Sequence, residues 1–128
     1  MTKRTALVAS AAALILAGSL QAHHSYSAFQ TDLKVSIEGT ITRIDFVNPH
    51  VIVEIKTKDG EYRAEFPGVT SLSRSNFKVY SLKAGDFVIA TGSPMKDREI
   101  KTISLMTELR RPSDGWVWPE AAPVLPPK

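Results

Sequence analysis

Hydrophobic and polar residues alternate along the chain from Lys34 onwards, which is the pattern of β-strands with one buried face. One parity is shared by Val35, Ile37, Gly39 and Ile41, and the opposite parity by Ile44 and Phe46. A change of parity inside one β-rich run requires an extra residue. We therefore predict a long first strand that is bent by a β-bulge near Thr42 and Arg43.

Two further strands follow in a predicted hairpin. Asn48-Pro49 ends the first run, since proline has no N–H to donate and restricts the residue before it. Alternation resumes from His50, with one face formed by Val51, Val53 and Ile55. Asp59-Gly60 is typical of a tight hairpin turn. After it, a third strand has one face formed by Tyr62, Ala64 and Phe66.

The spacing becomes helical between Gly68 and Lys78. In a short helix, one face would be formed by Val69, Leu72, Ser73 and Asn76, with Thr70 or Ser71 as the N-cap. The turn at 81–86 then leads into a fourth strand at 87–92, and a loop at 93–98 separates that strand from a fifth at 99–109.

This order predicts an all-β fold, a small five-stranded OB-fold-like barrel with one short helix. An SH3-like barrel or a short β-sandwich is the alternative, and neither needs a helix at 69–76. A small barrel fills its interior with side chains, so a ligand must bind on the surface or at the mouth. In OB-folds that surface includes the loops after strands one and four, here 46–49 and 93–98.

Residues 1–22 have the composition of a signal peptide. Lys3 and Arg4 precede an apolar run at 6–16, and small residues lead to Ala22. The run is shorter than the roughly 20 apolar residues of a membrane span, so we expect no stable membrane insertion after cleavage. Cleavage after Ala22 would make His23 the first residue, whereas cleavage after Ser19 would leave it inside the chain. We expect a periplasmic or secreted protein.

Four segments are therefore expected: the signal peptide 1–22, an N-terminal arm 23–33, the barrel domain 34–110 and a Pro/Trp-rich extended tail 111–128. Without the signal, the formal charge of +3 falls to +1, from 14 basic and 13 acidic residues. A near-neutral chain has no positive field with which to bind nucleic acid. There is no cysteine and no recognisable hydrolytic or phosphate-binding motif, so we expect a non-enzymatic protein.

The three histidines carry the most distinctive chemistry. A first residue His23 offers its amine and a ring nitrogen, a chelate suited to Cu(II) and less selectively to Ni(II) or Zn(II), while His24 and His50 add imidazoles. An extended arm of nine residues reaches about 30 Å, far enough to approach His50. We predict a copper site at His23, His24 and His50. Alternatively, His50 is a surface residue that orders its turn through a hydrogen bond.

The tail suggests a second function. Trp116 and Trp118 share a face if they are extended, and could stack on a sugar or peptide. They could instead pin the tail over an open barrel edge. The alternative to metal binding is thus an interaction module for an envelope protein, peptide or glycan, with structural histidines. A third hypothesis, an oxidative copper enzyme, requires open coordination positions.

Several short motifs resemble an uncharacterised family of small exported bacterial proteins. They are His23-His24-Ser25, Glu38-Gly39-Thr40, Asn48-Pro49-His50, and the run at 81–86 that leads to Gly92-Ser93-Pro94. The family is classed only as a domain of unknown function. The resemblance implies an exported OB-like barrel and transfers no activity. The segment at 67–78, which contains Arg74-Ser75-Asn76-Phe77, and the tail depart from the family pattern.

Overall fold

Strand β1 (Val35–Asp45) pairs with a different neighbour along each half of its length. Its first half is antiparallel to β4 (Phe87–Pro94), its second half to β2 (Val51–Thr57), and Thr40 pairs in both ladders. The register shifts between Ile41 and Arg43, which confirms the predicted bulge. These strands belong to a computed structural model that describes residues 26–121; the predicted signal peptide, His23, His24 and residues 122–128 lie outside that range.

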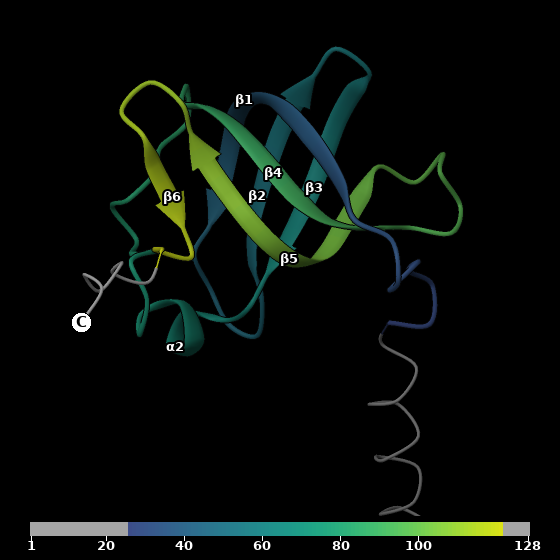
Figure 1. Ribbon diagram of the computed structural model, residues 1–128, viewed down its shortest axis with the longest axis horizontal. Helices are drawn as coiled ribbons and strands as arrows, with labels where there is room; N and C mark the ends of the chain where they lie inside the picture. The colour runs from purple at the N-terminus through teal and green to yellow at the C-terminus, as the bar shows by residue number, and fades with distance from the viewer. Residues whose placement is uncertain (1–25, 122–128) are drawn as a thin grey trace, which may run out of the picture.

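Five strands close into a barrel (Figure 1). β2 returns through the predicted tight turn into β3 (Gly60–Phe66), and Thr57 pairs with Gly60. β4 pairs antiparallel with β5 (Thr102–Arg111), and β5 closes the barrel through a parallel pairing with β3. The predicted fold class, a five-stranded OB-fold-like barrel with one short helix, is confirmed.

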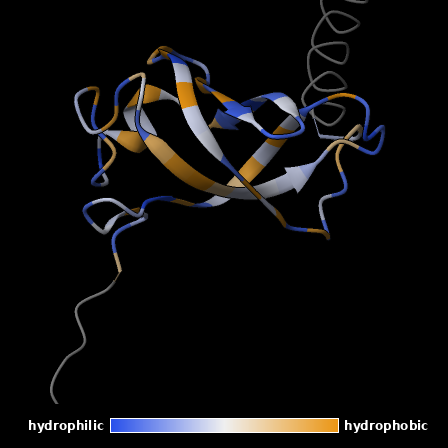
Figure 2. Cartoon of the chain, turned by 90° about the horizontal axis from the view of Figure 1, so that it is seen from above, coloured by the Kyte–Doolittle hydropathy of each residue, from blue (hydrophilic) through white to orange (hydrophobic). Residues whose placement is uncertain are grey.

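Side chains fill the barrel interior, as expected for a barrel of this size. Along the strands, hydrophobic positions alternate with polar ones, as the bands in Figure 2 show. The apolar residues that are at most 1% exposed are Ile41, Val51, Val53, Ile55, Ala64, Phe66, Leu72, Phe77, Val88, Ala90, Ile103 and Leu109. Burial of this apolar surface is the main favourable term in folding.

Helix α2 (Val69–Leu72) is shorter than the predicted 69–76. The predicted N-cap at Thr70 or Ser71 is wrong: Gly68 is the cap residue and offers no side-chain bond. Asn48 replaces a local cap, because its Oδ1 accepts the Val69 N–H at 2.9 Å. Asn76 is not helical and bonds to the tail instead, donating to the Val117 carbonyl oxygen at 2.6 Å.

The tail is extended at β6 (Trp116–Trp118), but it packs against the barrel. β6 pairs antiparallel with the end of β5, beyond the part that β3 covers. Trp118 is 7% exposed, lies edge-on to Phe66 and Phe77, and donates its Nε1–H to Ser75 Oγ at 3.0 Å. The interpretation that the tryptophans pin the tail over a barrel edge is therefore confirmed.

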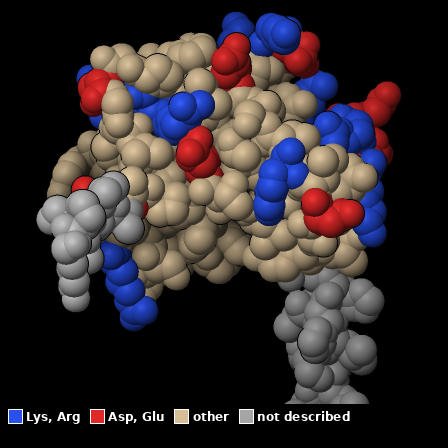
Figure 3. Space-filling model, viewed as in Figure 1, with Lys and Arg blue, Asp and Glu red and all other residues tan. Residues whose placement is uncertain are grey.

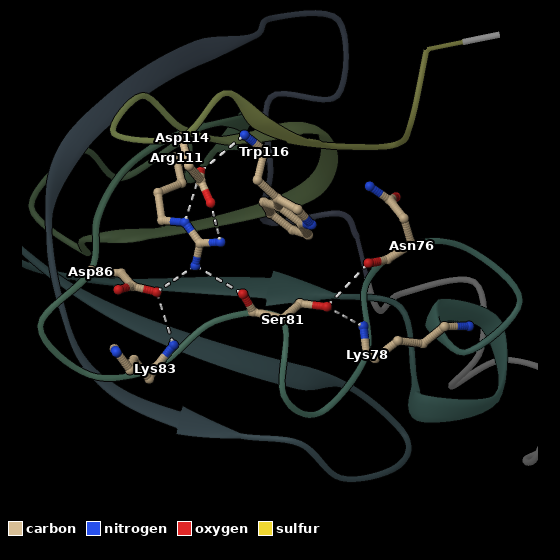
Figure 4. Close-up of polar contacts among 8 residues, drawn as sticks. All are labelled: Asn76, Lys78, Ser81, Lys83, Asp86, Arg111, Asp114 and Trp116. Atoms are coloured by element: carbon tan, nitrogen blue, oxygen red, sulfur yellow. Dashed lines mark hydrogen bonds and ion pairs between the residues drawn. The ribbon is translucent and has the colours of Figure 1, made fainter. Parts of the chain in front are cut away.

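Arg111 joins the end of β5 to two turns (Figure 4). Its Nη1 donates to Asp86 Oδ2 at 2.8 Å and to the Ser81 carbonyl oxygen at 2.9 Å, and its Nη2 donates to Asp114 Oδ2 at 2.8 Å. The hydrogen bond to Asp114 is the main cause that raises the pKa of Arg111. The same bond, supported by the Trp116 N–H, lowers the pKa of Asp114. These contacts hold the turn at 81–86 and the start of β6 in place.

We predict that Gly39→Ala destabilises the barrel. A Cβ at this position would lie 2.1 Å from the Lys56 carbonyl oxygen on β2, so the two backbones must move apart. Overpacking of this kind costs about 1–3 kcal/mol of unfolding free energy, which urea denaturation would measure. Glu38→Ala, at the exposed neighbouring position, is the control and should change stability little. Equal stability of the two variants would contradict the proposed role of the close approach.

We also predict a pH-dependent contribution from Asp114. A carboxyl whose folded pKa is lowered contributes stability above its unfolded pKa of about 4, and that contribution is lost as pH falls through the folded pKa. Asp114→Asn should therefore lower the urea midpoint of unfolding at pH 7. Below pH 4, the midpoints of the variant and of wild type should lie closer together. Asp59→Asn in the β2–β3 turn is the matched control. A constant deficit for Asp114→Asn at all pH values would refute the prediction.

Candidate functional site

A groove of about 330 Å³ brings together parts of the chain that are distant in sequence. Tyr26 of the arm and His50, just before β2, form part of its wall. The end of β3 and the residue after it contribute residues 65–67, and β5 contributes residues 104–106. The groove therefore lies beside the loop after β1, one of the two loops expected from the sequence to carry a ligand.

His50 is exposed, and only one of its ring nitrogens is engaged within the described part of the chain. Nδ1 lies 3.2 Å from the Phe66 carbonyl oxygen. Because a carbonyl oxygen can only accept, Nδ1 must carry the hydrogen, and the neutral imidazole then has its lone pair on Nε2. Among residues 26–121, Nε2 has no hydrogen-bond partner. The expectation that His50 orders its turn is confirmed, and Nε2 is available as a ligand.

The Asn48-Pro49-His50 motif attaches its loop to the end of β3. The Asn48 side chain accepts from the Val69 N–H, and the His50 side chain donates to the Phe66 carbonyl. Gly68 permits this approach, since a Cβ there would lie 2.7 Å from the Pro49 carbonyl oxygen. The motif thus fixes the position of the imidazole at the groove.

The arm is fixed close to the same groove by backbone hydrogen bonds. The Lys96 N–H donates to the Ala28 carbonyl at 2.8 Å, and the Gln30 N–H donates to the Pro94 carbonyl at 2.9 Å. Between them, Phe29 is 8% exposed. This anchoring places Tyr26, which is 39% exposed, in the lining of the groove.

The opposite wall of the groove comes from an irregular part of β5. Thr91 pairs with Glu108 and Ser93 with Ser104, so three residues of β5 oppose Gly92 alone. Within this bulge Leu105 has a φ of +49°, a left-handed backbone conformation that is strained for a residue other than glycine. Lys34 supports it, donating its Nζ hydrogens to the Leu105 carbonyl at 3.0 Å and to Ser93 Oγ at 2.8 Å.

The groove by itself supplies one imidazole. Among residues 26–121, no three His, Cys, Asp or Glu side chains gather in a way that would hold a metal ion. Glu65 lines the groove, but its carboxylate pairs with Arg63 Nε at 3.2 Å. Of the residues predicted to bind metal, the structure places His50, whereas His23 and His24 lie outside the described range. A complete nitrogen site would need them.

Tyr26, Leu105 and Met106 were missed as groove residues by reasoning from the sequence. Tyr26 belongs to a segment without a period, and the other two fit an ordinary strand pattern. Only the bulge in β5 distinguishes Leu105 and Met106 from ordinary strand residues.

A larger groove of about 600 Å³ lies between the first half of β1 and the β2–β3 hairpin. Its lining includes Lys56 and Lys58, and also Glu38 and Asp59, so no single charge dominates it. Acidic and basic side chains are likewise interspersed on the face shown in Figure 3. Among the described residues, no helix has the length and apolar character needed to cross a membrane.

Comparison with known proteins gives a family and little else. No curated protein matches the chain. A crystal structure of the ZRD-deleted mutant of TiaS in complex with agmatine is similar at 23% identity with a TM-score of 0.46, over 61% of this chain and 21% of that one. The chain thus spans about a fifth of that protein. The model of DUF6152, a family of unknown function, matches residues 11–104, and the protein belongs to this family, as its motifs predict.

Proposed function

We propose that this protein is an exported, non-enzymatic protein that binds a transition metal ion, preferably copper, through His23, His24 and His50. One observation carries the proposal: His50 and Tyr26, which lies two residues after His24, line the same groove. The segment that carries His24 therefore continues into a residue that lines the groove of His50.

Chain geometry makes this reach short. Consecutive Cα atoms are about 3.8 Å apart, so the His24 Cα lies within about 7.6 Å of the Tyr26 Cα. The arm consequently does not need the span of about 30 Å that its extended length would allow.

The environment of His50 suits a ligand. Metal-binding histidines commonly donate their second ring N–H to a carbonyl or carboxylate, which fixes the ring and its tautomer. The Nδ1 bond to the Phe66 carbonyl has this form and leaves Nε2 for a metal. With an imidazole from His24 and the ring and amine of an N-terminal His23, the donor set is rich in nitrogen, which favours Cu(II) among divalent ions.

The tryptophans that suggested an interaction module pack in the barrel instead. Trp118 is buried, and Trp116 contacts Phe77 and lies under the Arg111 guanidinium. We therefore propose no glycan or peptide site at the tail.

The test is a Cu(II) titration of protein that begins at His23, followed by electron paramagnetic resonance. His50→Asn retains an amide donor for the Phe66 carbonyl but has no equivalent of Nε2. We expect it to weaken Cu(II) binding at least about tenfold, the loss seen even when outer-shell partners are removed. A glycine added before His23 should weaken binding as well, because it removes the terminal amine from the chelate.

Glu65→Gln is the matched control in the same groove and should bind Cu(II) as wild type does, since the Glu65 carboxylate pairs with Arg63. Unchanged affinity in both His50→Asn and the glycine-extended protein would overturn the proposed site.

A further inference from the structure

We propose that the first half of β1 is a docking edge for an extended acidic peptide, which binds there as an added strand. Residues 35–39 pair with β4 on one edge, and on the other edge no strand within residues 26–121 pairs with them. This open edge lines the larger groove, of about 600 Å³. Its lining shares no residue with the groove of His50, so the proposal is independent of metal binding.

Backbone hydrogen-bonding groups of β1 face the open edge. The direction follows from Ile41, whose N–H donates to the Asp86 carbonyl at 2.9 Å and whose carbonyl accepts the Gly85 N–H at 2.8 Å. Both partners lie on the side of β4. Successive residues of an antiparallel strand direct these groups to opposite edges, and the ladder between β1 and β4 has no register shift. The N–H and carbonyl groups of Ser36 and Glu38 therefore point away from β4, toward the groove.

Unpaired strand edges are usually protected, because a row of free N–H and C=O groups can pair with another strand. Here the bulge of β1 lies beyond Ile41, and residues 35–39 include no proline and a single charged residue, Glu38. Ser36 and Glu38 together offer two N–H and two carbonyl groups to an added strand. Main-chain hydrogen bonds of this kind supply the affinity when an extended peptide joins the edge of a sheet.

The shape of the groove suits a single chain rather than a second barrel. The β2–β3 hairpin stands beside the first half of β1 in Figure 1, and residues 56–59 of the hairpin line the groove. A globular partner would meet this hairpin before it reached the edge of β1. A peptide one strand wide needs only the strand spacing of about 5 Å.

The two faces of an added strand would meet different surroundings. Val35 and Ile37 share the parity of the buried Ile41, and they pack with Tyr62 against the core while also lining the groove. Apolar side chains at every second position of the peptide would contact these three. The intervening positions would face outward, as the exposed Ser36 does on β1.

Charge favours acidic side chains at the outward positions of the peptide. Within the described part of the chain, no ion pair involves a charged lining residue of this groove. These residues are the cations Lys56, Lys58 and Arg98 and the carboxylates Glu38 and Asp59. Lys101 lies beside them, since its Nζ is 5.8 Å from the centre of the Tyr62 ring. Four cations therefore face two carboxylates, and such complementarity selects an acidic partner.

The probe is a short synthetic peptide in which valine and glutamate alternate, labelled with a fluorophore. We expect its fluorescence anisotropy to rise on titration with the protein, and less so at high salt, because salt screens the attraction to the lysines. The matched peptide with lysine in place of glutamate should bind at least about tenfold more weakly. Equal binding of the two peptides would refute the acidic preference, and no binding of either would overturn the docking edge.

Amide hydrogen exchange locates the bound strand. In the free protein the Ser36 and Glu38 N–H groups should exchange rapidly, whereas those of Ile37 and Gly39, which face β4, should be protected. Saturation with the valine–glutamate peptide should slow exchange at Ser36 and Glu38 at least about tenfold. Unchanged exchange there would overturn the proposal. Protection in a free protein that sediments as a dimer would do so too, because a second copy would then occupy the edge.

Two pairs of variants separate the edge from the charges. Glu38→Pro removes an N–H that faces the groove, and proline is tolerated where the N–H of an edge strand has no partner. It should weaken peptide binding at least about fivefold, while Glu38→Ala, which keeps the N–H, should bind at least as well as wild type. Lys58→Glu should weaken binding about twofold to fivefold, whereas Lys83→Glu, in the turn at 81–86, should have no effect.

Urea midpoints show whether the Glu38 variants remain folded. A folded Glu38→Pro that binds the peptide as wild type does would refute the added strand. If Glu38→Pro does not fold, peptides methylated on either alternate set of backbone nitrogens make the same test with the wild-type protein. Only the set that faces β1 should matter, and its methylation should weaken binding at least about fivefold. Equal binding of both methylated peptides and the parent would refute the proposal.

Discussion

The close approach of β1 and β2 at Gly39 is the constraint on which the rest of the barrel depends. A side chain there would collide with the Lys56 carbonyl, so only glycine lets β1 pass from its pairing with β4 to its pairing with β2. The bulge after Ile41 adds the bend that this change of partner requires. Once β1 serves two neighbours, the sheet curves far enough for β3 to meet β5 and close.

Closure also creates the groove. The parallel pairing of β3 with β5 places the end of β3 near the bulged residues of β5. The Asn48-Pro49-His50 loop is attached to that end of β3, and the arm is attached to the loop after β4. Segments that are distant in sequence thereby line one groove. The His50 ring is held by its bond to the Phe66 carbonyl, which suits a site whose geometry must be fixed.

The motifs that relate this chain to its family have different roles. The turn at 81–86 is structural: Asp86 accepts the Lys83 N–H and the Arg111 guanidinium, and Gly85 has a φ of +96° that side chains rarely adopt. Gly39 permits barrel closure. His50, in contrast, makes one bond within the fold and keeps Nε2 free of described partners, so it is where chemistry is to be expected.

The sequence by itself determined the five strands, the bulge near Thr42 and Arg43 and the turn at Asp59-Gly60, because alternation and turn residues are local properties. Tertiary structure decided what depends on distant partners. Helix α2 stops at Leu72, and Asn76 bonds to the tail instead of continuing the helix. Strand β6 lies where Trp118 packs against Phe66 and Phe77. Similarly, one side of the groove beside His50 depends on the strained bulge at Leu105, which Lys34 supports from a distant part of the chain and which no local pattern indicates.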